Sequence, residues 1–285
     1  MTAKRSIHSK LIQAFRGIFR NSIPQESCLD PTSNLSDIDY RLPEITGTVG
    51  DSLIKNTGPA TTKKKSLKPI IRDVKKVIEV FKEDAYLEFY DDLFSNLYEL
   101  PLNILEVGVY KGGSLLMFAH YFENARLMGI DITPPDQKLY DEIRDSDLKD
   151  RVSVGLGSQD DLDFLEETIT SWFRGECLDI VFDDASHLYE QTRSTFDYIF
   201  HHQLGSGGMY IIEDWGAGYW PKWPDGNPDG MHGLPRLVKE LVDDVALRDR
   251  SMLFEGERAL PVTDELQSSI DKMIVAPSIV VLFKA

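Results

Sequence analysis

Acidic side chains and one histidine follow two short apolar runs in the second half of the chain. The run I-V-F ends in D-D-A-S-H, and the run M-Y-I-I ends in E-D. Apolar runs of this length between turn signals predict buried strands of a parallel sheet, and open α/β sheets bind ligands beyond the carboxyl ends of their strands. Neighbouring strands lie about 4.8 Å apart, so the polar groups that follow them would meet at one point. These groups are Asp183, Asp184, His187, Glu213 and Asp214.

A cluster of carboxylates of this kind needs a cation. Like charges at short range destabilise one another unless positive charge neutralises them, and oxygen ligands suit Mg²⁺. His187 follows Asp184 by three residues, so a turn would bring both side chains to the same site. A neutral imidazole accepts a proton readily because its pKa lies near neutral pH. The structural alternatives are a histidine that only caps or packs a helix start, and a solvated loop start at Glu213 and Asp214.

A glycine-rich turn, E-V-G-V-Y-K-G-G, joins a predicted strand to a predicted helix. Glycine permits positive φ and a close approach of a ligand to the backbone. Asp131 ends the next predicted strand, about 20 residues on, where an acidic side chain can accept hydrogen bonds from ribose hydroxyls. Tyr110 occupies the second glycine position of the dinucleotide fingerprint, which disfavours a pyrophosphate and favours an adenosyl ligand such as S-adenosylmethionine. In the alternative, Gly108 and Gly112 only allow tight packing of strand and helix.

Strands and helices alternate along the chain, which predicts a doubly wound α/β domain. Strands are expected at 102–107, 125–132, 151–156, 179–183 and 209–213. The tail supplies two more strands, joined at Ala276-Pro277-Ser278 as a hairpin that closes the sheet. Amphipathic helices are expected at Leu67–Glu83, Ala85–Tyr98 and Leu234–Leu247. The predicted fold is a Rossmann-like, doubly wound, mostly parallel seven-stranded sheet with an antiparallel C-terminal hairpin and an N-terminal helical extension.

Five segments together resemble a known family. They are L-E-V-G-V-Y-K-G-G-S-L, G-I-D-I, G-S-Q-D-D, D-I-V-F-D-D-A-S-H and G-G-M-Y-I-I-E-D-W. They are similar to class I S-adenosylmethionine-dependent, Mg²⁺-dependent sugar O-methyltransferases, which include the macrolide and rhamnosyl O-methyltransferases and the related set named after cephalosporin hydroxylase. The similarity covers about residues 83–224 and the terminal strand pair. The family's usual D-D-G-S-H reads D-D-A-S-H here, which keeps every reactive group.

The resemblance implies a set of site residues. The Mg²⁺ ligands would be Asp184, Glu213 and Asp214, and the general base would be His187. The methionine and ribose parts of the cofactor would contact Glu106, Gly108, Gly112, Ser114 and Asp131, and its adenine would contact Ser158, Gln159 and Asp160. Mg²⁺ on two vicinal hydroxyls would orient and acidify the acceptor, while the base takes the proton during an in-line methyl transfer.

The resulting prediction is an O-methyltransferase that uses S-adenosylmethionine and Mg²⁺. Its acceptor would be a sugar hydroxyl of a glycosylated natural product, a glycolipid or a polysaccharide. One alternative is the same chemistry on a catechol-like phenol, and another is a metal-dependent hydrolase that activates water without S-adenosylmethionine. A third alternative is a non-catalytic protein that binds an adenosyl compound. In loop 216–233, the residues Tyr219, Trp220 and Trp223 would stack on the sugar or, alternatively, form a small satellite core.

The whole chain has 285 residues and a net charge of −16, which argues against nucleic acid as its main partner. We expect a basic N-terminal helix with a loop or lid at 1–68 and the methyltransferase domain at 69–285. Residues 1–25 form either a peripheral membrane contact or a helix that docks on the acidic body or on a partner subunit. Two cysteines without a framework indicate a reducing, cytoplasmic compartment. We also expect a homo-oligomer.

Overall fold

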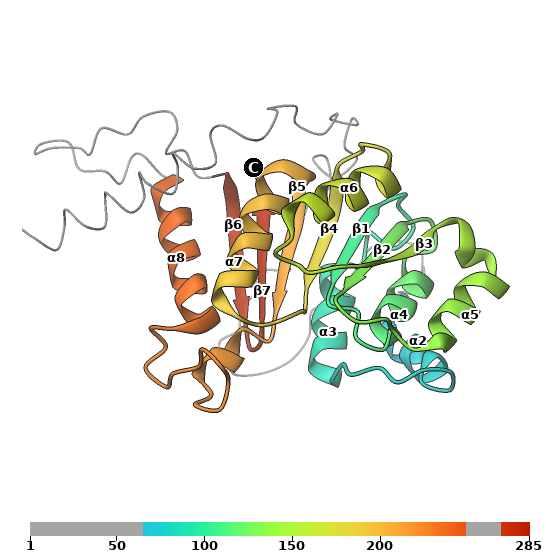
Figure 1. Cartoon of the computed structure of the whole chain (residues 1–285), viewed down its shortest axis with the longest axis horizontal. Coiled ribbons are helices and arrows are strands. Elements are labelled where there is room, and N and C mark those ends of the chain that lie inside the picture. Colours follow the sequence, from blue (N-terminus) through green and yellow to red (C-terminus); the bar gives the residue numbers. More distant parts are fainter. Residues whose placement is uncertain (1–64, 249–268) are drawn as a thin grey trace, which may run out of the picture.

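A seven-stranded sheet forms the centre of the computed structural model, which describes residues 65–248 and 269–285 (Figure 1). The strand order is β3-β2-β1-β4-β5-β7-β6, and the first five strands in this order are parallel. The strands are β1 (Asn103–Val107), β2 (Arg126–Asp131), β3 (Val152–Leu156), β4 (Leu178–Asp183), β5 (Leu204–Glu213), β6 (Ile270–Ala276) and β7 (Ile279–Lys284). Strands β6 and β7 form the expected antiparallel hairpin, and β7 pairs with β5. The predicted fold is therefore confirmed.

Helices cover both faces of the sheet because successive strand residues point to opposite faces. On β1, Ile104 packs in one core and Leu105 in the other. The helices on the first face are α2 (Leu67–Val74), α3 (Asp84–Leu93), α4 (Gly113–Tyr121) and α5 (Gln137–Asp145). Those on the second face are α6 (Leu162–Phe173), α7 (Tyr189–Tyr198) and α8 (Gly233–Arg248). Three short helical turns complete the described elements: η1 (Asp147–Asp150), η2 (Ile199–Gln203) and η3 (Trp215–Tyr219).

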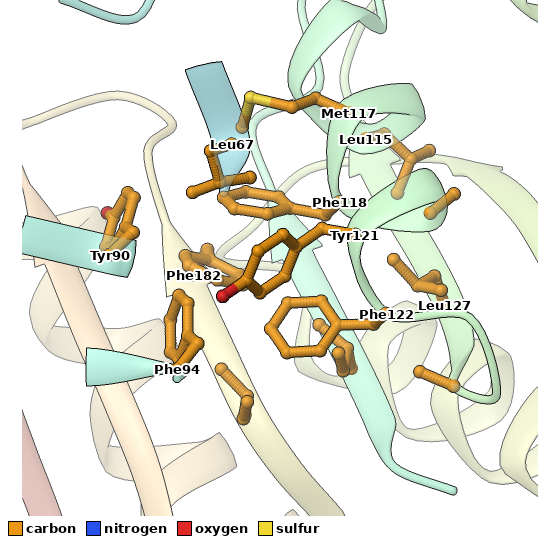
Figure 2. Packing of buried hydrophobic residues seen from close by; sticks show 14 of the residues in the cluster. Leu67, Tyr90, Phe94, Leu115, Met117, Phe118, Tyr121, Phe122, Leu127 and Phe182 are labelled. Carbon is orange, nitrogen blue, oxygen red and sulfur yellow. The ribbon is translucent and has the colours of Figure 1, made fainter. Parts of the chain in front are cut away.

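Aromatic rings hold α3 and α4 against the middle of the sheet (Figure 2). Phe182 of β4 stacks on Phe118 of α4 with ring centroids 4.2 Å apart. Tyr90 and Phe94, from the side of α3, meet the same Phe182 ring edge-on at 5.6 and 5.8 Å. These rings are fully buried, and aromatic pairs of this geometry add about 0.5–1.5 kcal/mol each beyond the area they bury. The packing fixes α3 directly beside the strand end at which the candidate site lies.

The helix predicted over Leu67–Glu83 is too long. It ends as α2 at Val74, and residues 79–83 belong to no helix. Burial alternates along this stretch: Ile78, Val80 and Lys82 are buried, and the residues between them are exposed. A period of two is that of an extended chain, and the apolar spacing of the sequence fits a helix equally well. The second predicted helix, Ala85–Tyr98, is also shorter in the structure, whereas the helix predicted at Leu234–Leu247 is confirmed as α8.

Several predictions fall on residues 1–64, outside the described part of the chain. They are the basic helix at 1–25, its membrane or partner contact, and nearly all of the loop or lid at 1–68. The boundary at residue 68 stays a prediction. None of the helices in the described ranges is both long enough and apolar enough to cross a bilayer.

Asp179 of β4 makes the stability of the fold depend on pH. Its Oδ2 accepts a hydrogen bond from the backbone N–H of Asn103 at 2.7 Å, and burial raises its pKa to about 6. A group with a raised folded pKa holds its proton more tightly when folded, so stability falls as pH rises from 3.8, its ordinary value, to about 6. We expect Asp179→Asn, whose amide oxygen can accept the same bond, to add up to about 3 kcal/mol above pH 6 and nothing below pH ~4.

Urea denaturation between pH 3.5 and 8 measures this effect. The exposed Asp150 provides the matched control, as Asp150→Asn, and should show no such pH dependence. A constant difference between Asp179→Asn and the unmodified chain at every pH would contradict the assignment.

Candidate active site

A cavity of about 550 Å³ opens at the carboxyl ends of β1, β2 and β4 and at the loop after β3. Gly108, Asp131, Gln159, Asp184 and Asp214 are among the residues that line it. Each of these follows or ends a strand, so the walls of the cavity come from parts of the chain that are distant in sequence. A volume of this size is typical of a site for a small molecule or cofactor.

Three side chains that could hold a metal ion meet at one side of the cavity. Asp184, His187 and Asp214 each offer a ligand atom, and these atoms lie within 4.8 Å of one another. Nε2 of His187 is 3.7 Å from Oδ1 of Asp184. Strands β4 and β5 are direct neighbours, with Asp183 opposite Ile212, so the residues that follow these two strands come together. Three of the five polar groups expected to meet at this point therefore lie together.

The backbone at this cluster is unusual. His187 and Asp214 have φ values of 53° and 51°, and Tyr110, which also lines the cavity, has a φ of 50°. Residues other than glycine adopt the left-handed region at a cost, and such residues gather at functional sites. Three of them around one cavity indicate that the surrounding structure holds these side chains in place.

Glu213 and Asp183 are not among these three candidate metal-binding side chains. Glu213 is buried, with Oε2 in contact with Nζ of Lys82 and Oε1 accepting a hydrogen bond from the Tyr90 hydroxyl at 2.7 Å. Asp183 is buried as well and accepts a hydrogen bond from the Tyr210 hydroxyl at 2.6 Å. Asp184, His187 and Asp214 thus form a candidate metal site among the described residues, and the assignment of Glu213 as a ligand stays a prediction. This donor set fits a divalent cation, because Mg²⁺ takes one or two carboxylates and completes its shell with water or substrate.

Lys82, Tyr86 and Tyr90 also contact the acidic cluster, and the sequence analysis predicted none of the three. Nζ of Lys82 lies 2.6 Å from Oδ2 of Asp184, and the Tyr86 hydroxyl donates a hydrogen bond to Oδ1 of Asp214. The three residues recur every four positions in K-x-x-x-Y-x-x-x-Y. That spacing puts polar tips on one face of a helix, and this is the one signal that could have indicated them.

Burial and charge oppose each other at these groups. Burial alone would lower the pKa of Lys82, but the carboxylates of Asp184 and Glu213 outweigh it and raise that pKa, so the ammonium stays protonated. Burial raises the pKa of Glu213 to about 7, and Asp184 adds to this while Lys82 opposes it. Burial also raises the pKa of Glu106 to about 8, against the opposing effect of Lys82.

The glycine turn is shaped by contacts within the protein. Gly108 has a φ of +94°, and a Cβ there would lie 2.2 Å from the backbone oxygen of Asp184. Gly112 has a φ of +98°, and a Cβ would lie 2.5 Å from Cδ2 of Leu139. Close packing therefore requires both glycines, as in the structural alternative. Gly108 and Ser114 also line the cavity, whereas Gly112 does not.

Two predicted cofactor residues are held in place by local hydrogen bonds. Oδ2 of Asp131 accepts from the backbone N–H of Tyr110 at 2.7 Å, and Oδ1 accepts from that of Thr133 at 2.8 Å. Gln159 accepts from the backbone N–H of Ser186 at 3.0 Å, so it fixes the loop that carries the histidine. Both residues line the cavity, together with Ser158 and Asp160, which hydrogen-bond to each other.

Glu106 is a buried carboxyl group without a satisfied partner. Ser114 is near enough to lower its pKa, yet neither carboxyl oxygen makes a hydrogen bond of normal geometry with any described residue. A buried group left in this way indicates a missing partner. The lysines that line the cavity, Lys82 and Lys111, are already paired with carboxylates. A ligand with hydroxyl and amino groups therefore fits better than one with phosphates.

The aromatic residues of the 216–233 loop do not line the cavity formed by the described residues. Tyr219 packs edge-on against Trp215 with ring centroids 6.0 Å apart, and Trp220 is 60% exposed. Nε1 of Trp223 donates to the backbone oxygen of His187 at 3.1 Å, with the two rings 5.8 Å apart. Trp223 thus supports the histidine loop, and contact of these residues with a substrate stays a prediction.

Residues 105–215 match the family described as a methyltransferase domain. Demethylmacrocin O-methyltransferase from Streptomyces fradiae and mycinamicin VI 2''-O-methyltransferase from Micromonospora griseorubida are each 33% identical to the chain over 163 residues. Each match covers 54% of this chain and 38% of the relative. The chain thus spans about two-fifths of the length of these curated relatives.

Solved structures agree with the fold. MycE methyltransferase from the mycinamycin biosynthetic pathway, determined in complex with Mg and SAH, has a TM-score of 0.61 at 24% identity. The superposition covers 79% of this chain and 55% of that chain. The resemblance to sugar O-methyltransferases and the Rossmann-like sheet, both expected from the sequence, are confirmed.

Gly108→Ala tests whether close packing at the glycine turn supports the site. Gly175 is the matched control, because it also has a positive φ, of +76°, but a Cβ there would meet nothing within 4 Å. We expect Gly175→Ala to cost about 1 kcal/mol for its backbone conformation and Gly108→Ala about 3 kcal/mol or more, because overpacking is added. Urea denaturation of the two variants measures the difference. Equal losses of stability in the two variants would show that the backbone around Asp184 can move to accommodate a Cβ at position 108.

Proposed function

We propose that this chain, which carries a methyltransferase domain distantly homologous to macrolide and deoxysugar O-methyltransferases, methylates a sugar hydroxyl. The methyl donor is S-adenosylmethionine, and the acceptor belongs to a glycosylated natural product, a glycolipid or a polysaccharide. The observation that carries the proposal is one cavity with a ribose-type acidic residue, Asp131, and a metal-type cluster at Asp184, His187 and Asp214.

The cofactor in this proposal lies along the carboxyl ends of β1 and β2. Asp131 accepts hydrogen bonds from the ribose hydroxyls, and Ser158 and Asp160 lie near the adenine. Ser114, which lines the cavity, and the buried Glu106 beneath it would bind the methionine part. Sulfonium and amino groups carry positive charge, which an acidic cavity favours.

The acceptor hydroxyl in this proposal is activated at the acidic cluster. Asp184 and Asp214, with the predicted ligand Glu213, would hold Mg²⁺, and the bound ion would supply the charge that lowers the pKa of the sugar hydroxyl. His187 then removes the proton as the methyl group moves from sulfur to oxygen in line. Nε2 of His187 lies 3.7 Å from Oδ1 of Asp184, so this carboxylate would stabilise the imidazolium that forms. The products are a methyl ether and a neutral thioether, and the proton stays on His187.

The remaining alternatives differ in what they require of the cavity. A catechol-like acceptor would present two aromatic hydroxyls to the same cation, so the choice between phenol and sugar rests on acceptor assays. A hydrolase without S-adenosylmethionine does not account for the methyltransferase match over 105–215. The homo-oligomer and the cytoplasmic location stay predictions.

Calorimetric titration with S-adenosylmethionine tests the cofactor. We expect Asp131→Ala to weaken binding by about tenfold to a hundredfold, because each hydrogen bond to a charged group contributes about 1.5–3 kcal/mol. Asp150→Ala, which removes an exposed carboxylate on η1, should bind as the unmodified chain does. If the unmodified chain binds no S-adenosylmethionine, the proposed methyl donor is wrong.

Methyl transfer to candidate acceptors tests the base. His187→Ala should retain cofactor binding and lose about 10²–10⁴-fold in rate, the usual contribution of a general base. Transfer of a labelled methyl group from S-adenosylmethionine, with glycosides and catechols compared side by side, measures this loss. If His187→Ala kept the full rate of methyl transfer, His187 would not be the general base.

A further inference from the structure

Two residues of the 216–233 loop contact the backbone on either side of the His187 side chain. Nε1 of Trp223 donates a hydrogen bond to the backbone oxygen of His187 at 3.1 Å, and Oδ2 of Asp225 accepts one from the backbone N–H of Tyr189 at 2.8 Å. Each bond joins residues that are 36 positions apart in the sequence. The loop after β5 therefore holds the turn that follows β4.

We propose that Trp223 and Asp225 are positioning residues, which together hold His187 where its imidazole can take the proton of the acceptor hydroxyl. This inference rests on the proposed function, because it concerns the base of the same reaction. It gives Trp223 a role other than the stacking on a sugar that the sequence predicted. In this role, neither residue has to touch the acceptor or the cofactor.

The backbone of His187 requires support from its surroundings. Its φ of 53° lies in the left-handed region, which is unfavourable for a residue other than glycine. Such a conformation persists only where the surrounding structure fixes it. On the N-terminal side of the turn, the backbone N–H of Ser186 donates to Oε1 of Gln159 at 3.0 Å. Trp223 and Asp225 supply the support at His187 itself and on its C-terminal side.

Helix α7 begins directly after this turn and has no local cap. Leu188 occupies the N-cap position and makes no side-chain cap hydrogen bond, because a leucine side chain has no acceptor. The first backbone N–H groups of a helix have no partner within it, and Asp225 accepts that of Tyr189. A carboxylate is favourable at this place because the N-terminus of a helix carries partial positive charge. Asp225 thus fixes the start of α7, and with it the end of the turn that carries His187.

The segment that carries Trp223 and Asp225 is itself folded into two tight turns. The backbone N–H of Trp223 donates to the backbone oxygen of Trp220 at 2.9 Å, and that of Gly226 donates to the backbone oxygen of Trp223 at 3.0 Å. A Cβ at position 226 would lie 2.1 Å from the backbone oxygen of Trp220, so the chain can turn back this closely only at a glycine. These turns bring two side chains, two residues apart, to two backbone groups with the same separation.

The ring of Trp223 also packs near the imidazole of His187. The two ring centroids are 5.8 Å apart, and the His187 side chain is only 15% exposed. A phenylalanine at position 223 would keep an aromatic ring in this place but would lack the N–H group. Trp223→Phe therefore separates the hydrogen bond from the packing.

Steady-state kinetics of methyl transfer tests the role of Trp223, with the same glycosides and catechols as acceptors. We expect Trp223→Phe to lower kcat about tenfold to a hundredfold, because a shift of about 1 Å in a reacting group costs a rate factor of this order. The KM for the acceptor and the Kd for S-adenosylmethionine should stay within about twofold, since only the base is displaced. Trp172→Phe is the matched control: Nε1 of Trp172 is buried without a hydrogen-bond partner among the described residues, so kcat should not change.

Asp225 provides a second test through a conservative variant. Asp225→Ala removes the acceptor for the Tyr189 N–H and should lower kcat about tenfold, whereas Asp225→Asn keeps an acceptor oxygen and should restore kcat to within about threefold. Asp229→Ala is the control, because the exposed Asp229 accepts a backbone N–H only from Met231 of the same loop. An Asn variant as slow as the Ala variant would overturn the role of this hydrogen bond. If Asp225→Ala does not fold, Trp223→Phe decides the inference.

A double variant shows whether Trp223 acts through His187. Positioning has no effect once the base is gone, so adding Trp223→Phe to His187→Ala should slow the residual transfer by no more than about twofold. The two changes are then coupled by nearly the whole effect of Trp223→Phe. Equal rate factors in both backgrounds would overturn the proposal, because Trp223 would then act independently of the histidine.

Reaction of His187 with diethyl pyrocarbonate separates this inference from the proposed function, because it needs no acceptor. Mass spectrometry of the peptide that contains His187 gives the rate of carbethoxylation. We expect this rate to be at least about threefold higher in Trp223→Phe than in the unmodified chain or in Trp172→Phe, because the turn opens more often. An unchanged rate would overturn the anchoring by Trp223, including where no tested acceptor is methylated. A higher rate in a chain that binds no S-adenosylmethionine would retain the anchoring and overturn the proposed function.

Discussion

The structure depends on gathering carboxylates at the buried ends of two adjacent strands. Asp184 follows β4 and Glu213 ends β5. Because these two strands pair in parallel, the two carboxylates lie next to each other. Such a group is unfavourable in a protein interior unless it is neutralised, and each charge there needs both an opposite charge and hydrogen bonds. Lys82 satisfies part of this requirement within the chain itself. The remaining negative charge would favour a cationic ligand in the cavity.

The position of Lys82 in turn depends on the aromatic core. Phe182, near the end of β4, packs between Phe118 of α4 and the rings that accompany α3. This packing places the start of α3, and with it the ammonium group, beside the strand end. Tyr90 belongs to both systems, since its ring packs on Phe182 while its hydroxyl donates to Glu213. The hydrophobic core and the polar site are therefore one connected structure, and a change in either affects the other.

At the side of the cavity formed by Gly108, Asp131 and Gln159, backbone geometry matters more than charge. Positive φ at Gly108 and the absence of a Cβ let the end of β1 approach the backbone oxygen of Asp184. Asp131 is held by two backbone N–H groups and keeps a fixed orientation at the cavity wall. Gln159 links the loop after β3 to the loop of His187. The Asp131 end and the acidic end of the cavity thus share walls, which suits the proposed transfer between a methyl donor and an acceptor.

The sequence by itself determined where the strands end and which polar residues follow them. Local patterns sufficed for Asp131, for the pair Asp184 and His187, and for the acidic residues after β5, because strand ends meet at one edge whatever the details of packing. Contacts of the acidic cluster with distant parts of the chain became visible only in the tertiary structure. Lys82 contacts Asp184 and Glu213 across 102 and 131 residues, and its apolar neighbours fit a helix as well as an extended chain. The local spacing groups Lys82 with Tyr86 and Tyr90 but does not encode a contact of that separation, since the contact arises from the packing of α3 on the sheet.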